Sequence, residues 1–225
     1  MGVNKKQRFE EVASFDHVSE LTDFQDEKSE KPRGRWNKDI FGNSNPNIVE
    51  LACGKGTYTL ELARRNPQKN YIGIDIKGAR IWKGATCARD KQLENVHFLR
   101  IYIDHLHEYF GPAEIDDLWI TFPDPYPKGS DRNKRLTSPK FLRIYQKVLH
   151  PEGKVRLKTD SDKLFSFTQQ VITDTSCEQI DIVEDIYRQK SNNKLLTIQT
   201  DYEKEHLAKG RTISFISFSL PDDPI

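Results

Sequence analysis

Short apolar runs alternate with segments of helical spacing along most of this chain. The apolar runs predict strands near 49–51, 71–75, 96–101, 115–122, 154–158, 179–186 and 211–220. Helical spacing predicts helices over 57–63, 79–93, 138–149 and 161–173, with a short helix over 105–110. Strands that alternate with helices are typical of an α/β fold, in which helices cover both faces of a mostly parallel sheet.

Three segments depart from this alternation. Residues 150–153 predict a turn, and residues 189–210 form a polar loop too long for a simple connection, which favours a functional role. Residues 1–40 are polar and mixed in charge, which predicts a partly mobile N-terminal arm before a single domain over 41–225. Within the arm, Trp36 beside basic residues favours either stacking on a base or attachment of the arm to the domain.

Composition narrows the class of protein. Hydrophobic residues make up 36% of the chain, charged residues 31%, and the formal net charge is +1. No apolar run approaches the ~18 residues of a membrane span, and no signal peptide is evident, so we expect a cytoplasmic protein. Cys53, Cys87 and Cys177 are scattered, which favours neither a disulfide framework nor a metal site, and Cys53 is interpreted as a small loop filler. Monomer and homodimer both remain open.

A glycine-rich loop follows the first predicted strand. Gly54 and Gly56 would let a nucleoside ligand approach the backbone, and Asp75 ends the next strand, where a carboxylate can accept hydrogen bonds from ribose hydroxyls. The dinucleotide fingerprint G-x-G-x-x-G fails, because position 52 is Ala and position 59 is Thr. An NAD(P)-dependent reductase is therefore disfavoured. The remaining pattern, E-x-x-x-G-x-G from Glu50, resembles the first motif of class I methyltransferases, which bind S-adenosylmethionine.

The fourth predicted strand leads into a second candidate loop, Pro123-Asp124-Pro125-Tyr126-Pro127-Lys128. Three prolines stiffen it, and the carboxyl end of a central strand is where open α/β sheets place their chemistry. Between residues 128 and 143, six Lys or Arg stand against the single acid Asp131, which favours contact with a nucleic-acid backbone.

Taken together, the motifs resemble the bacterial tRNA (guanine-N7)-methyltransferases over residues from about 45 to 218. They are E-L-A-C-G-K-G, G-I-D-I, F-P-D-P-Y-P-K, N-K-R-L-T, K-T-D and T-D-Y-E. The resemblance implies a Rossmann-like class I fold with a central seven-stranded sheet. It also implies methyl transfer from S-adenosylmethionine to N7 of guanosine 46 in the tRNA variable loop, with tRNA as the partner and no metal.

The resemblance also implies site residues. Cofactor contacts fall on Glu50, Asp75, Asp104 and Asp124, beside the loop glycines Gly54 and Gly56, and Asp124 is in addition the implied catalytic residue. Substrate contacts fall on Lys128, Asp160, Thr200, Asp201, Tyr202 and Glu203. The implied RNA-contacting segment consists of Ser130, Asp131, Arg132, Asn133, Lys134 and Arg135.

Four features depart from the family pattern. Ala52 replaces a glycine near the cofactor, Tyr126 replaces a tryptophan, Asp201 stands where lysine is common, and 129–131 interrupt a denser basic run. Two alternatives remain: a small-molecule or protein methyltransferase on the same fold, and a non-catalytic RNA-binding module. The basic segment disfavours the first, and the complete set of acids disfavours the second.

Overall fold

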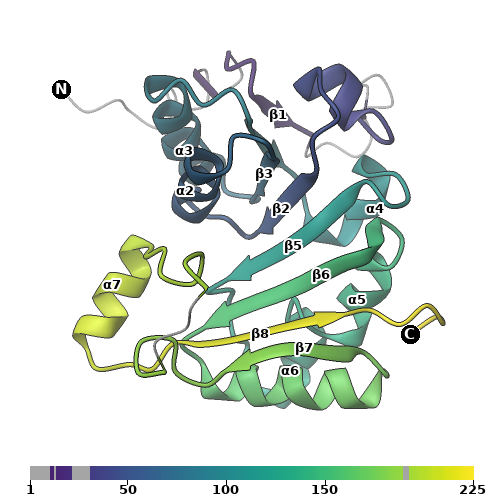
Figure 1. Cartoon of the computed structure of the whole chain (residues 1–225), viewed down its shortest axis with the longest axis vertical. Helices are drawn as coiled ribbons and strands as arrows, with labels where there is room; N and C mark the ends of the chain where they lie inside the picture. The colour runs from purple at the N-terminus through teal and green to yellow at the C-terminus, as the bar shows by residue number, and fades with distance from the viewer. Residues whose placement is uncertain (1–10, 13, 22–30, 190–192) are drawn as a thin grey trace.

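The computed structural model describes residues 11–12, 14–21, 31–189 and 193–225. One eight-stranded sheet runs through the molecule in the order β1-β4-β3-β2-β5-β6-β8-β7 (Figure 1). Its strands are β1 (Val18–Glu20), β2 (Asn47–Leu51), β3 (Asn70–Ile74), β4 (Val96–Arg100), β5 (Ile115–Thr121), β6 (Leu149–Thr159), β7 (Glu178–Val183) and β8 (Ser214–Ser219). Strand β8 runs antiparallel to its neighbours β6 and β7, and the other strand pairs of the described residues are parallel. The predicted mostly parallel sheet is therefore confirmed.

Helices cover both faces of the sheet, as predicted. The α-helices of the described residues are α2 (Thr57–Arg65), α3 (Gly78–Asp90), α4 (Leu106–Tyr109), α5 (Pro139–Tyr145), α6 (Asp162–Asp174) and α7 (Asp201–Ala208), of which α2 to α6 pack on the faces. Successive strand side chains point to opposite faces, so Val49 joins the apolar cluster under α4, α5 and α6, while Ile48 joins the one under α2 and α3. Among the described helices, none is long and apolar enough to cross a membrane.

The sheet has one strand more than the seven predicted. Strand β1 lies in the polar N-terminal stretch and pairs parallel with β4 at the sheet edge. Its apolar content is too small for the pattern to reveal it. The division into an arm (1–40) and a domain (41–225) stays a prediction, because residues 1–10, 13 and 22–30 lie outside the described residues.

Trp36 is fully buried, so the interpretation that it stacks on a base is wrong. It begins a short π-helix, Trp36–Phe41, and its ring stacks on Phe110 with centroids 4.8 Å apart. Its indole Nε1 donates to the carbonyl of Tyr109 at 2.9 Å. The alternative, that Trp36 attaches this segment to the domain, is confirmed.

Two predicted loops turn out to be regular structure. The 150–153 turn is an irregularity inside β6, which continues on both sides of it while its register against β5 shifts. The predicted loop over 189–210 contains α7, which lies beside the carboxyl ends of β5 and β6 (Figure 1). Thr200 caps this helix by accepting from the backbone N–H of Glu203.

Candidate functional site

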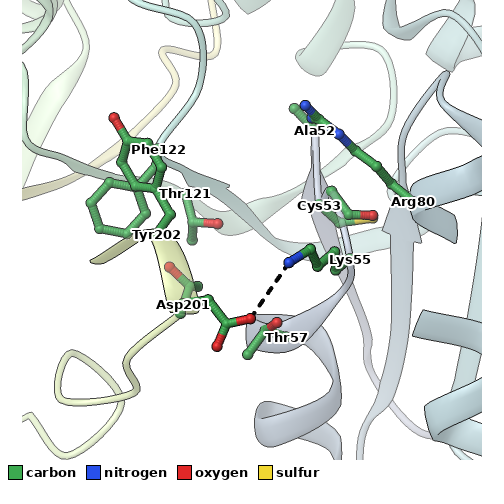
Figure 2. A pocket seen from close by; sticks show the side chains of 11 residues that line it. Ala52, Cys53, Lys55, Thr57, Arg80, Thr121, Phe122, Asp201 and Tyr202 are labelled. Carbon is green, nitrogen blue, oxygen red and sulfur yellow. Dashed lines mark hydrogen bonds and ion pairs between the residues drawn. The ribbon is translucent and has the colours of Figure 1, made fainter. Parts of the chain in front are cut away.

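Two adjoining cavities open where the parallel strands end. The first, of about 270 Å³, lies between the glycine loop, the end of β5 and residues 200–202; we call it the α7 cavity (Figure 2). The second, of about 290 Å³, is lined by Asp75, Asp104 and Asp124; we call it the acid cavity. Ala52 and Arg80 line both, so the cavities form one crevice.

The loop after β2 brings backbone close to this crevice. Gly54 and Gly56 have φ of 59° and 66°, and a Cβ on Gly56 would lie 2.5 Å from the ring of Phe98. Ala52, which precedes the two loop glycines, also has a positive φ, 54°. A side chain in this left-handed region is strained by roughly 1–2 kcal/mol, so Ala52 adopts this backbone shape at a cost in stability.

Asp75 is held at the wall of the acid cavity by two backbone donors. Its Oδ2 accepts from the N–H of Gly54 at 2.9 Å, and its Oδ1 accepts from the N–H of Lys77 at 2.8 Å. A carboxylate oxygen accepts two hydrogen bonds, so each oxygen keeps one acceptor site. The geometry therefore fixes the carboxylate and leaves it able to bind a pair of hydroxyl groups.

Glu50 lies beneath the glycine loop and lines neither cavity. Its carboxylate accepts from the Thr59 N–H at 2.9 Å and from the hydroxyls of Thr59 and Thr121. Burial raises the pKa of this carboxyl to about 7, although the hydrogen bonds oppose the shift. In this structure Glu50 ties the first turn of α2 to the end of β5.

The proline loop presents a carboxylate on strained backbone. Phe122 and Tyr126, each followed by proline, have φ of 49° and 41°. Asp124 between them is exposed and lines the acid cavity, and no described residue donates to its carboxylate. The loop is braced from below, because Arg135 donates to the carbonyls of Pro125 and Tyr126 at 2.9–3.2 Å.

Arg135 is therefore not placed as an RNA contact. It is only 8% exposed, and its guanidinium lies 4.3 Å from the Phe167 ring centroid. The rest of the predicted RNA-contacting segment forms an exposed 3₁₀ turn, Gly129–Lys134, in which Lys134 pairs with Asp131 at 2.9 Å.

The other cations between residues 128 and 143 are divided between internal partners and solvent. Lys140 pairs with Asp104 beside the acid cavity, so that acid is not free. Arg143 donates to the carbonyl of Ile225 at 2.5 Å. Lys128 and Arg132 have no acidic partner within ion-pair distance among the described residues.

The start of α7 closes the α7 cavity from the far side. Asp201 lies 3.6 Å from the Lys55 ammonium of the glycine loop (Figure 2). Tyr202 is 44% exposed and stacks on His206, with centroids 3.9 Å apart. Asp160 lies beneath, 2.8 Å from Nδ1 of His206 and 3.4 Å from the Tyr202 hydroxyl. The predicted substrate contacts Asp160, Thr200, Asp201 and Tyr202 thus gather at one rim.

Glu203 belongs to the interior. Its side chain and that of Lys158 are fully buried, 2.7 Å apart, so a direct contact of Glu203 with substrate does not fit this arrangement. Lys158 also donates to the carbonyls of Leu196 and Ile198, at 2.7 and 2.9 Å. Burial lowers the pKa of the Lys158 ammonium, against the attraction of Glu203. This pair fastens the segment before α7 to β6.

The sequence places Lys158 at the end of the predicted strand over 154–158 and does not identify its partner. The T-x-x-E spacing from Thr200 to Glu203 is a capping-box signature, which would have indicated α7 in place of a loop. The interpretation of Cys53 is confirmed, because it is buried and burial raises the pKa of its thiol well above the ordinary value.

Known proteins are similar to this chain in sequence and in fold. Residues 44–216 match the family described as putative methyltransferase. A tRNA (guanine-N(7)-)-methyltransferase of Bacteroides thetaiotaomicron is 39% identical, covering 100% of this chain and 89% of its own length. One of Christiangramia forsetii is 42% identical, over 96% and 98%. The 16S rRNA methyltransferase KamB superposes with a TM-score of 0.62 at 12% identity, over 82% of this chain and 92% of that one.

Proposed function

Since this chain belongs to the tRNA (guanine-N7)-methyltransferase family, we propose that it methylates N7 of guanosine 46 in the tRNA variable loop, with S-adenosylmethionine as donor. The structural observation that carries the proposal is Asp124, an unpaired carboxylate on a braced, strained loop at the wall of the acid cavity. The full-length relationship to tRNA methyltransferases supports the substrate class.

The acid cavity fits the proposed cofactor on the chemistry of its acceptors. Asp75 offers two fixed oxygens to the ribose hydroxyls, and Asp104 lines the same cavity. Glu50 would act from beneath, by holding the glycine loop through Thr59. When bound, S-adenosylmethionine supplies a methyl group on a positively charged sulfur.

Asp124 would orient the guanine and stabilise its charge. Guanine N7 carries a lone pair and no proton, so the reaction needs no base at N7. The Asp124 oxygens are free to accept from the N1–H and the exocyclic amine of the base, which would fix the opposite edge of the ring. The same negative charge stabilises the positive charge that the purine gains. Alignment of this kind supplies up to ~7–11 kcal/mol.

The rim of the α7 cavity and the start of the basic segment would supply further contacts to the RNA. Tyr202 presents an exposed ring on which a base can stack, and Asp160 holds its hydroxyl. Lys128 and Arg132, exposed and without acidic partners among the described residues, would contact phosphate.

The reaction can be tested directly. The purified protein is incubated with S-adenosylmethionine and two tRNA transcripts that differ only in carrying guanosine or adenosine at position 46. Mass spectrometry of nuclease digests should find N7-methylguanosine in the first transcript and background in the second. Equal methylation of both would place the target elsewhere, and no methylation of total tRNA would favour a small-molecule or protein substrate.

The role of Asp124 is tested by Asp124→Asn. We expect the single-turnover rate to fall about 10²-fold, while cofactor affinity stays within a few-fold. Asp39→Asn, an exposed acid in the π-helix at the amino-end edge of the sheet, is the matched control and should change neither value. An unchanged single-turnover rate in Asp124→Asn would remove this residue from the mechanism.

A further inference from the structure

Beyond the α7 cavity, a groove of about 500 Å³ runs between α2, α3 and residues 197–204. Five cationic side chains and one acid line it: Lys55, Arg65, Lys83, Lys91, Lys204 and Glu61. We call it the lysine groove. Since the whole chain carries a formal charge of only +1, this is a local concentration of positive charge.

Helical spacing builds the two walls of the lysine groove. Lys83 and Cys87 lie on α3, and Lys91 follows its last residue, so the four-residue spacing puts all three on one side of the helix. On α2, Glu61 and Arg65 are one turn apart on the facing side. The third wall comes from α7, where Tyr202 lines the α7 cavity and Lys204 the groove.

The charge of the groove is available to a ligand. Glu61 is held by Arg64 and Arg65 at 2.7 Å, which lowers the pKa of its carboxyl to about 2. Lys83, Lys91 and Lys204 are exposed, and no carboxylate of the described residues lies within ion-pair distance of any of them. Three flexible ammonium groups on two helices suit phosphates spaced along a backbone, which they would contact without reading sequence.

The groove also lies where a polynucleotide would continue. It shares Lys55 and Thr57 with the α7 cavity, which in turn shares Ala52 and Arg80 with the acid cavity. The 3₁₀ turn over 129–134 lies at the far end of this series. Over the longer basic stretch 128–143, only Lys128 and Arg132 have no internal partner among the described residues, so this stretch offers few phosphate contacts by itself.

We propose that the lysine groove binds backbone phosphates of the tRNA on the side of the crevice away from the proline loop. This rests on the proposed function, because it assumes that the polynucleotide entering the crevice is tRNA. A nucleotide held between the proline loop and α7 would then have backbone contacts on both sides.

The test compares two triple variants. The first is Lys83→Ala/Lys91→Ala/Lys204→Ala. The matched control is Lys38→Ala/Lys69→Ala/Lys147→Ala. It removes three lysines that precede β2, β3 and β6, at the amino ends of the strands and away from the crevice. Affinity for tRNA is measured over a range of salt concentrations for both and for the unaltered chain, together with affinity for S-adenosylhomocysteine and thermal unfolding.

We expect the groove variant to bind tRNA at least about tenfold more weakly at 100 mM salt, with the slope of log affinity against log salt smaller by about 2. Affinity for S-adenosylhomocysteine and the melting temperature should not change. The control should stay within twofold in every measurement.

Other outcomes overturn the proposal in distinguishable ways. An unchanged salt slope, or an equal loss in both triple variants, would show that the groove is not a phosphate site. Unchanged tRNA affinity with an altered oligomeric state would assign the groove to a second copy of the chain. If the unaltered chain itself binds no tRNA, the proposed function is wrong, and the inference that rests on it is wrong as well.

Discussion

Removal of the Lys158 ammonium should strongly destabilise the protein. In Lys158→Met, the Glu203 carboxylate would stay fully buried and keep only the Tyr187 hydroxyl as a side-chain donor, at 2.7 Å. The carbonyls of Leu196 and Ile198 would lose their donor as well. A methionine fills a similar volume, so the effect reports the lost charge and not a cavity.

The magnitude follows from these lost partners. Breaking a buried ion pair by removing one member typically costs about 3–5 kcal/mol, because the other charge remains uncompensated. The double variant Lys158→Met/Glu203→Gln removes both charges and leaves the two carbonyls unpaired, for about 1–3 kcal/mol. The two substitutions should therefore be strongly non-additive, with the double variant more stable than Lys158→Met alone.

Urea unfolding measures this, with methyl transfer as a second readout. At a slope of roughly 2–3 kcal/mol per molar, the midpoint of Lys158→Met should fall by about 1–2 M, and the double variant should recover part of the loss. Because the pair fastens residues 195–203, the surviving fraction should show a raised KM for tRNA and a nearly unchanged affinity for S-adenosylhomocysteine. A loss below 1 kcal/mol, or simple additivity, would refute the argument.

Three further predictions concern the crevice. Burial raises the pKa of Glu50 to about 7, so the folded state binds its proton more tightly than the unfolded state does, and this group's contribution to the free energy of unfolding falls as pH rises from about 4.5 to 7. Glu50→Gln should lack that fall and gain about 1–3 kcal/mol relative to the unaltered chain between pH 5 and pH 8, measured by chemical denaturation; parallel pH curves would contradict this. Ala52→Gly should raise the melting temperature or leave it unchanged, whereas Ala52→Val should lower it by several degrees, since a β-branched side chain resists the positive φ found there. Arg135→Ala should slow single-turnover methyl transfer by releasing the proline loop, yet leave the salt slope of tRNA binding unchanged, and a flattened slope would show that Arg135 reaches RNA after all.

The apolar runs predicted the sheet, because strands that are buried on both faces consist mainly of consecutive apolar residues. Runs such as Tyr71–Ile74 and Val96–Leu99 have no partner other than a hydrophobic interior, and they became β3 and β4. Glycine and proline predicted the two loops of the crevice for a similar reason, since each restricts φ in a way that few other residues share. The short edge strand β1 and helix α7 carry neither signal strongly, so both were missed.

The positions of charged side chains were harder to predict, because charged residues are expected at the surface unless a partner is known. The resemblance implied an RNA contact at Arg135 and a substrate contact at Glu203, and the apolar pattern placed Lys158 at the end of a predicted strand without indicating a partner. In the structure Lys158 and Glu203 are fully buried, and Arg135 is nearly so. Their partners are distant in sequence: Lys158 reaches Leu196, Ile198 and Glu203, up to 45 residues away. Such pairings depend on the folded chain and have no local pattern.

The buried charges share one mechanical property that links stability to catalysis. Glu50 connects the first turn of α2 to the end of β5. Arg135, which precedes α5, holds the proline loop, and Lys158 connects β6 to the segment that leads into α7. Each therefore connects a wall of the crevice to rigid structure through hydrogen bonds that hydrophobic contact could not orient. Methyl transfer depends mainly on alignment, so small displacements of these walls should lower the rate before they unfold the protein. The geometry of the crevice therefore depends on charged residues that position its walls without contacting the substrate.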